Sequence, residues 1–127
     1  MRKAMLAGAA MAIAAAGAWA GAAWGSGQAA PKAYIVARMS IHDPAGFARY
    51  APQVPAVLAM HGGRYLARAG RFELLEGAAA GDRAVILEFP SMDAARAFYY
   101  SPEYQAIAPI RRAATEGGSF IVEGVAP

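Results

Sequence analysis

The sequence predicts an α+β fold in which two helices cover one face of an antiparallel sheet. A Gly-Gly doublet occurs twice, at Gly62-Gly63 and Gly117-Gly118, each time after a stretch with apolar residues at helical spacing. A strand-like run precedes each helical stretch, and another follows each doublet. The chain therefore repeats a strand-helix-strand unit. Two such units with right-handed crossovers form a βαββαβ chain, which is the ferredoxin-like arrangement.

The first unit begins with an apolar, partly β-branched strand predicted over Ala33–Met39. Asp43-Pro44 then predicts a helix start, since Asp accepts hydrogen bonds from the first-turn amides and Pro suits the first helical position. Pro52 and Pro55 each remove an internal hydrogen bond, so we expect a kink or two short helices. Gly62 supplies the left-handed residue that ends this helix.

Three strand-like runs lie in the middle of the chain. Gly63–Arg68 is the second strand, and a turn at residues 69–71 leads into a short extra strand predicted over Phe72–Glu76. After a loop at residues 78–82, Arg83–Phe89 is the next main strand, and Pro90 ends it.

The second unit closes with a helical region and one more strand. Ser91 or Asp93 caps the first helix, and Ser101-Pro102 restarts the helix with a new cap. Pro109 is expected to distort this last helix. Gly117-Gly118 is expected to end it, and Ser119–Glu123 is the predicted final strand.

The N-terminal segment has the composition of an export signal. Arg2 and Lys3 precede a run of Ala, Gly and other uncharged residues, which contains a small-residue cleavage pattern at Ala18-Trp19-Ala20. We expect residues 1–20 to be a signal peptide, residues 21–32 a flexible leader and residues 33–127 the domain. The alternative is an uncleaved membrane anchor, which the Ala- and Gly-rich composition disfavours. The sequence thus predicts an exported protein, periplasmic or secreted.

The charge distribution argues against nucleic acid as a partner, and the cysteine content excludes disulfide bonds. The whole chain carries a net charge of +3, but loss of Arg2 and Lys3 with the signal leaves 10 basic residues against 9 acidic ones, or +1. These basic residues are scattered, so the chain lacks the clustered basic face that nucleic acid binding requires. There are no cysteines, so export brings no disulfide framework.

The predicted sheet has an apolar face that its two helices leave uncovered. Val85, Leu87 and Phe89 alternate with Ala84 and Ile86, so both faces of this strand are apolar. An uncovered apolar face favours a second sheet packed against it. We therefore expect a homodimer that pairs sheet to sheet.

Several short motifs resemble a known family. They are Asp43-Pro44, Gly62-Gly63-Arg64, Leu75-Glu76-Gly77, Glu88-Phe89-Pro90, Ala94-Ala95, Val122-Glu123-Gly124 and, most specifically, Ser101-Pro102-Glu103-Tyr104-Gln105. Together they resemble the domain of unknown function 1330 family over about residues 33–125. The resemblance implies a dimeric α/β-barrel, in which two ferredoxin-like sheets face each other. It implies no established reaction, although relatives in the wider superfamily include cofactor-free monooxygenases and isomerases.

Charged residues inside strands are the first candidates for a site. Arg38, Arg64 and Glu88 could line a ligand pocket, since a buried charge needs solvent or an opposite charge. Aligning Leu66 with Ile121 in the two units places Arg68 and Glu123 on the same face. The alternative is that all five form ion pairs at strand ends or at the dimer interface.

Aromatic residues and one histidine complete the candidate set. Tyr50, Tyr99 and Tyr104 lie on helix faces directed at the sheet, and each is either core or a hydroxyl donor in a pocket. His61 and Glu88 are weak candidates for a general base. No metal motif and no cofactor are predicted. The function hypothesis is binding of a small aromatic or carboxylated ligand, with cofactor-independent oxygenation or isomerisation as its catalytic form; the alternative is a non-enzymatic dimerising module.

Overall fold

The computed structural model describes residues 29–78 and 81–127, and Pro31–Ala126 form one structural unit. Its strands are β2 (Ala33–Ile41), β3 (Arg64–Arg68), β4 (Arg83–Phe89) and β5 (Thr115–Glu123). Its helices are α3 (Pro44–Tyr50), the 3-10 turn η2 (Ala51–Gln53), α4 (Val54–Met60), α5 (Met92–Tyr99) and α6 (Pro102–Ala114).

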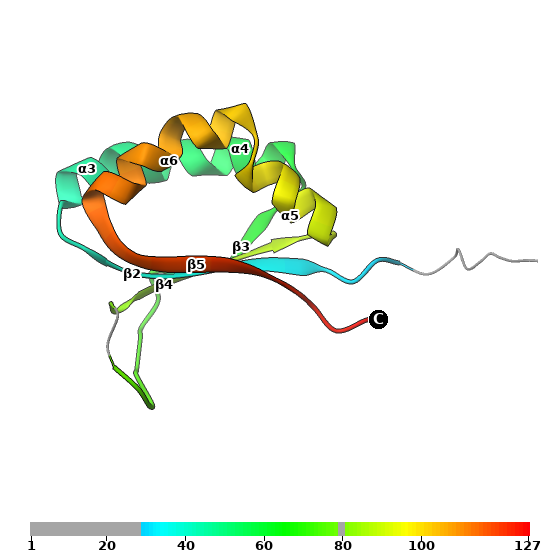
Figure 1. Ribbon diagram of the computed structural model, residues 1–127, viewed down its shortest axis with the longest axis horizontal. Coiled ribbons are helices and arrows are strands. Elements are labelled where there is room, and N and C mark those ends of the chain that lie inside the picture. The colour runs from blue at the N-terminus through cyan, green and yellow to red at the C-terminus, as the bar shows by residue number, and fades with distance from the viewer. Residues whose placement is uncertain (1–28, 79–80) are drawn as a thin grey trace, which may run out of the picture. The chain divides into compact units, whose positions relative to one another are not determined.

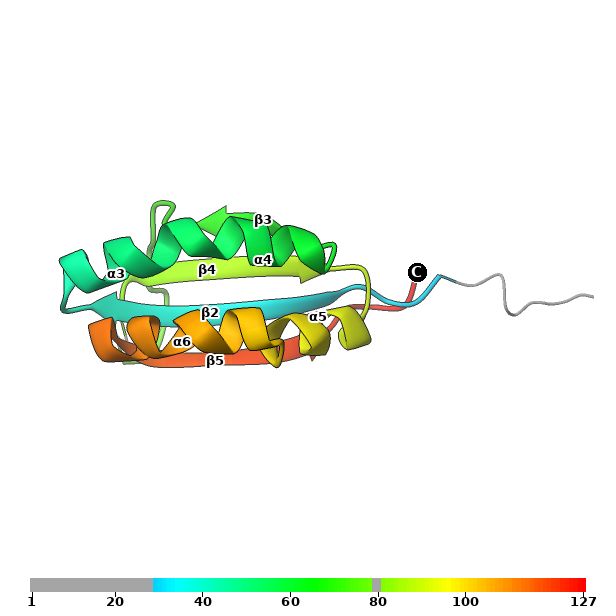
Figure 2. The ribbon, with the colours of Figure 1, turned by 90° about the horizontal axis from the view of Figure 1, so that it is seen from above.

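The strands form a four-stranded antiparallel sheet in the order β3-β4-β2-β5. All of the helices lie above one face of this sheet (Figure 1). Seen from above, α3 and α4 run over the side of the sheet that holds β3 and β4, while α5 and α6 run over β2 and β5 (Figure 2). This is the predicted ferredoxin-like fold, and the prediction of its class is confirmed.

The first helical region is divided into two short α-helices, as its prolines predict. The Asp43 side chain accepts a hydrogen bond from the amide of Gly46 at 3.1 Å and caps α3. Pro52 lies in the 3-10 turn η2, and Pro55 lies in the first turn of α4. Gly62 has a φ of +71°, so it ends α4 in the left-handed conformation that glycine favours.

The core lies between the helices and the sheet. Ile35 on β2 pairs with Leu87 on one side and with Ile121 on the other, which places these three side chains on the covered face. Phe89 and Phe98 are fully buried, with ring centroids 5.2 Å apart. The sheet and helices thus bury their apolar faces against each other in two layers.

The short strand predicted over Phe72–Glu76 is wrong, because these residues form part of the loop between β3 and β4. The loop extends from the sheet on the side away from the helices (Figure 1). Arg38 holds it by donating to the carbonyl of Gly81 at 3.0 Å and to that of Ala78 at 3.4 Å. The Arg38 guanidinium also lies 5.2 Å from the ring centroid of Phe72. These side-chain contacts hold the loop without a strand partner.

The prediction that Gly117-Gly118 ends the last helix is also wrong. Helix α6 ends at Ala114, and both glycines lie inside β5, paired with Met39 and Arg38. The helix end needs no glycine, because the amides of His42 and Asp43 donate to the Ala114 carbonyl at 3.0 and 3.2 Å. The final strand is consequently longer than predicted and begins at Thr115.

The caps of the second helical region are those that the sequence predicts. Ser91, with its side chain accepting from the Ala94 amide, caps α5, and Ser101 caps α6 in the same way. Helix α6 is continuous through Pro109. Pro109 is exposed, so it lies on the outer face of the helix.

The predicted signal peptide over residues 1–20 and most of the predicted leader over residues 21–32 lie outside the described residues. Within the described residues, the helices are too short or too polar for any to cross a membrane.

Candidate functional site

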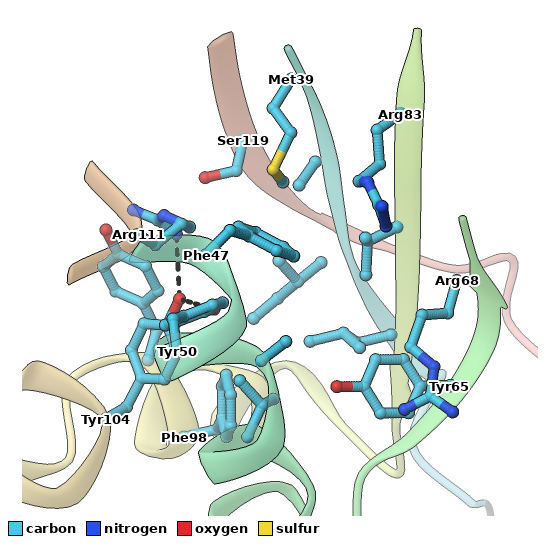
Figure 3. A pocket seen from close by; sticks show the side chains of 17 residues that line it. Met39, Phe47, Tyr50, Tyr65, Arg68, Arg83, Phe98, Tyr104, Arg111 and Ser119 are labelled. Carbon is cyan, nitrogen blue, oxygen red and sulfur yellow. Dashed lines mark hydrogen bonds between the residues drawn. The ribbon is translucent and has the colours of Figure 1, made fainter. Parts of the chain in front are cut away.

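A cavity of about 100 Å³ lies between the helices and the covered face of the sheet. Its apolar wall comes from both layers, with Ile35 and Leu87 from the sheet and Val54 from the helices. Phe47 and Phe98 complete this wall from the helical side (Figure 3). A single water molecule needs about 10–15 Å³ of such space. The cavity therefore has room for a group of several heavy atoms, such as one ring.

Two tyrosine hydroxyls and an arginine meet at the helical side of this cavity (Figure 3). The hydroxyl oxygens of Tyr50 and Tyr104 are 2.7 Å apart, and Nη1 of Arg111 donates to the Tyr104 hydroxyl oxygen at 2.9 Å. Only one of the two hydroxyl protons lies between the tyrosines, so the other is free for a third partner. The guanidinium also carries five N–H donors, and the bond to Tyr104 uses one. The trio thus offers donors to a ligand.

Both tyrosines stay protonated in the physiological pH range. Burial raises the pKa of Tyr50, and the neighbouring Tyr104 raises it further. Burial also raises the pKa of Tyr104, although the hydrogen bond between Tyr104 and Tyr50 and the positive charge of Arg111 act in the opposite direction. Neutral hydroxyls in an apolar site act as hydrogen-bond donors, and neither of them acts as a base near neutral pH.

Two further arginines border the cavity, each against an aromatic ring. The Arg83 guanidinium lies 5.3 Å from the ring centroid of Phe47, and that of Arg68 lies 4.4 Å from the ring centroid of Tyr65. Such cation–π contacts hold a guanidinium in place while leaving its N–H groups at the ring's edge.

A β-bulge directs Arg68 to the covered face. Tyr65 pairs with Leu87, but the next pairs are Ala67 with Ile86 and Arg68 with Val85, so Leu66 is the extra residue. Because side chains alternate along a strand, this extra residue reverses the face of the sheet to which the following side chains of β3 point. Arg68 therefore borders the cavity instead of pointing to the opposite side of the sheet.

The cavity lining is positively charged. Arg68, Arg83 and Arg111 are among the lining residues, and the described lining contains no carboxylate. With apolar walls, protonated tyrosines and guanidinium groups that have no carboxylate among the described lining residues, the cavity has the chemistry to hold an apolar group that carries a negative charge.

A family model described as domain of unknown function (DUF1330) matches residues 32–125. The chain belongs to this family. No curated protein matches the sequence.

Solved structures show the fold of this DUF1330 domain. A protein of unknown function from Rhodopseudomonas palustris is 21% identical with a TM-score of 0.63, over 80% of this chain and 88% of that chain. SnoaB, a cofactor-independent oxygenase from Streptomyces nogalater, is 21% identical with a TM-score of 0.52, over 77% of this chain and 97% of that chain. At this level of identity, the likeness concerns the fold alone.

The DUF1330 cavity brings together part of the candidate set. Tyr50, Tyr99 and Tyr104 all line it, together with Arg68. Glu123 pairs with Ala33, which places it on the same face of the sheet as Arg68. The two residues lie on opposite edge strands, β3 and β5, and Glu123 is not part of the lining.

Three other candidates lie on the opposite face of the sheet. Arg64 pairs with Glu88 in the strand register, and Nε of Arg64 lies 2.8 Å from Oε1 of Glu88. Arg38 is on the same face, where it holds the β3–β4 loop. None of the three is among the residues that line the cavity.

His61 lies at the C-terminal end of α4, outside the cavity lining. Its ring packs edge-on against Phe98 at 6.1 Å. Its Nε2 is buried and has no hydrogen-bond partner in the described part of the chain. A histidine at this end of a helix can interact favourably with the negative end of the helix dipole. Within the described residues, no three His, Asp or Glu side chains cluster as ligands for a metal ion.

The sequence reasoning did not include Arg83, Arg111 or Phe47 in the candidate site. Arg111 follows Tyr104 by seven residues, which is two helical turns, and this spacing places it on the same helix face as Tyr104. That signal could have identified Arg111. Arg83 could not have been identified, because its contact with Phe47 joins two segments distant in the chain.

Proposed function

We propose that this protein binds a small aromatic or carboxylated molecule in the cavity between its helices and its sheet. The observation that carries the proposal is the lining itself: three arginines, two hydrogen-bonded tyrosine hydroxyls and an apolar wall, with no carboxylate among the described lining residues. An anionic ligand would neutralise the guanidinium charge, and its apolar part would displace water from the wall.

Arg111 is the residue we expect to contact the ligand's negative charge. It is half-buried, and Tyr104 holds one of its nitrogens in place. Hydrogen bonds between ionised groups are roughly twice as strong as those between neutral groups. A guanidinium held in one orientation also loses less conformational entropy when it binds a carboxylate.

The proposal concerns ligand binding first, and catalysis is its secondary form. The two predicted bases, His61 and Glu88, are not among the residues that line the cavity. A cofactor-independent oxygenation or isomerisation, the catalytic form of the hypothesis, would have to use the tyrosine hydroxyls as proton donors. The alternative is a non-enzymatic dimerising module. The Arg64–Glu88 pair favours this alternative, because it lies on the face of the sheet proposed below for subunit pairing.

The proposal includes a homodimer formed through the face of the sheet that the helices do not cover. Phe120 and Val122 lie on that face, 58% and 44% exposed. Half-buried Val36 and Ile86 continue the apolar surface across β2 and β4. A second copy packed there would bury apolar side chains that a monomer leaves in water.

We also propose that the protein is exported after cleavage near residue 20, as its N-terminal composition predicts. The N-terminal sequence of protein recovered from the periplasm or the medium tests this. A mature chain that begins at Met1 and stays in the membrane fraction would contradict it.

Calorimetric titration with benzoate and with benzamide tests ligand binding, because the two differ mainly in charge. We expect benzoate to bind and benzamide to bind more weakly. Arg111→Gln should reduce the affinity for benzoate at least about tenfold, because a hydrogen bond to a charged group contributes about 1.5–3 kcal/mol and about 1.4 kcal/mol is a factor of ten. Arg49→Gln is the matched control, since Arg49 is exposed on α3 and does not line the cavity. Equal binding of both probes, or none of either, would overturn the proposal.

A further inference from the structure

A second, larger cavity adjoins the first at the end of α6. It measures about 430 Å³, and its lining includes Arg111 and Arg112 from α6 and residues 115–119 from β5. Ligand pockets for small molecules usually measure about 300–1,000 Å³. The outer cavity falls within this range, whereas the inner one, at about 100 Å³, is below it.

The two cavities share part of their lining. Met39, Arg111 and Ser119 line both. Arg111 therefore stands at the junction, with its bond to Tyr104 on the inner side. Ser119 is exposed on the edge strand β5, so the junction lies near solvent.

The outer cavity follows from the way α6 joins β5. The strand begins at Thr115, directly after the last helical residue, and the Thr115 hydroxyl donates to the Arg111 carbonyl at 2.8 Å. Gly117 and Gly118 follow and contribute no side chains to the lining. Side chains of β5 consequently leave space beside the end of α6, and this space is the outer cavity.

The charge of the outer cavity is also positive on its helical side. Arg112 is exposed and adds to the charge of Arg111. Glu116 is the acidic residue in the lining, but it pairs with Ser40, and the strand register directs both side chains to the uncovered face. An anionic group in the outer cavity would thus meet Arg112, while the strand register directs the Glu116 carboxylate away from the helical side.

We propose that the two cavities form one site for an aryl-alkanoate, a ligand with an apolar ring, a flexible chain and a terminal carboxylate. The ring occupies the inner cavity and the chain passes Arg111 and Ser119. The carboxylate of this longer ligand extends beyond Arg111, which contacts the charge of a short acid such as benzoate, and binds Arg112. The inference rests on the proposed binding function and extends it, because it assigns the length of the ligand and the position of its charge.

Titration with 6-phenylhexanoate and benzoate tests the extension. Only the longer acid reaches the outer cavity, so Arg112→Gln should weaken binding of 6-phenylhexanoate about three- to fivefold and leave binding of benzoate unchanged. This size follows from the modest strength of exposed ion pairs. Arg112→Glu, which reverses the charge, should weaken it further. Arg49→Gln, another exposed arginine, should leave both affinities unchanged.

The outcomes separate this inference from the proposed function. If benzoate binds but Arg112→Gln affects both acids equally, or neither, the two-cavity site is wrong and the inner site stands. If neither acid binds the wild-type protein, both proposals fail. Circular dichroism of each variant shows whether the fold is intact, which the exposure of Arg112 leads us to expect.

Discussion

Among single residues, Tyr104 connects the core to the candidate site. Its ring is buried and packs 4.7 Å from that of Phe98, while its hydroxyl contacts both Tyr50 and Arg111. The side chain thus belongs to the apolar core along its length and to a polar contact at its tip, as is common for buried tyrosines.

Replacing Tyr104 with Phe should lower the free energy of unfolding by about 1–2 kcal/mol, because Tyr50 and Arg111 lose a hydrogen-bond partner in a buried setting. Urea denaturation measures the change. Tyr100→Phe is the control, since Tyr100 is 62% exposed and should change stability by less than about 0.5 kcal/mol. Equal effects of the two substitutions would show that the hydroxyl contacts contribute nothing.

The raised pKa values of Tyr50 and Tyr104 predict a loss of stability at alkaline pH. In the unfolded chain these tyrosines lose their protons near pH 10, but the folded state retains them. Stability is therefore fully present below about pH 10 and falls above it, by up to about 1.4 kcal/mol per pH unit for each tyrosine.

Urea denaturation between pH 8 and pH 11.5 measures this slope. Tyr50→Phe should be less stable at pH 8 but should lose less stability as the pH rises. If wild type and variant lose stability in parallel, the Tyr50 hydroxyl does not titrate differently in the folded state.

At the scale of elements, the two Gly-Gly doublets look alike in sequence but have different roles. Gly62 ends α4 in the left-handed region, and Gly63 follows where a side chain would collide with Leu58 and Phe89. Gly117 lies within β5 with a φ of +146°, where a Cβ atom would collide with the backbone of Arg38. The first doublet is a helix stop, and the second permits close pairing of two strands.

Gly117→Ala should therefore lower the free energy of unfolding by about 2 kcal/mol or more, from backbone strain and the collision with β2. Gly118→Ala is the neighbouring control, because an added Cβ atom there meets nothing within 4 Å. Thermal denaturation of both variants measures the difference. A Gly117 variant as stable as the Gly118 variant would contradict the strand-pairing role.

At the scale of the whole domain, the sheet divides the molecule into two chemically different faces. The covered face holds the core and the cavity, while the other carries Phe120, Val122, the Arg64–Glu88 pair and the loop held by Arg38. The proposed ligand site and the proposed subunit contact therefore lie on different faces of the sheet, so substitutions can test the two proposals independently.

Phe120→Glu should convert the proposed homodimer to a monomer, because it places a charge from each subunit in the proposed apolar interface. Size-exclusion chromatography with light scattering at micromolar concentration measures the mass. Met60→Glu is the control, since Met60 is equally exposed, at 59%, but lies on α4 in the helical layer. A wild-type protein that is already monomeric would exclude the sheet-to-sheet dimer.

Much of the fold follows from local signals in the sequence. Asp43, Ser91 and Ser101 cap helices because their side chains bond amides three residues on, a short-range interaction that the sequence shows directly. The cavity tyrosines are predictable in the same way, from helical spacing. The site was less predictable: the bulge at Leu66 changes the face of Arg68, and no local signal marks it.

By itself, the sequence determined the order of the four main strands and the helical regions and the ferredoxin-like class, because hydrophobic periodicity and capping act over a few residues. The tertiary structure decided which charges meet. It paired Arg64 with Glu88 on the uncovered face and brought Arg38 of β2 into contact with the β3–β4 loop. It also placed Arg111 against Tyr104 beside the cavity. Such contacts depend on strand register and on the packing of helices against the sheet, which join residues far apart in the chain.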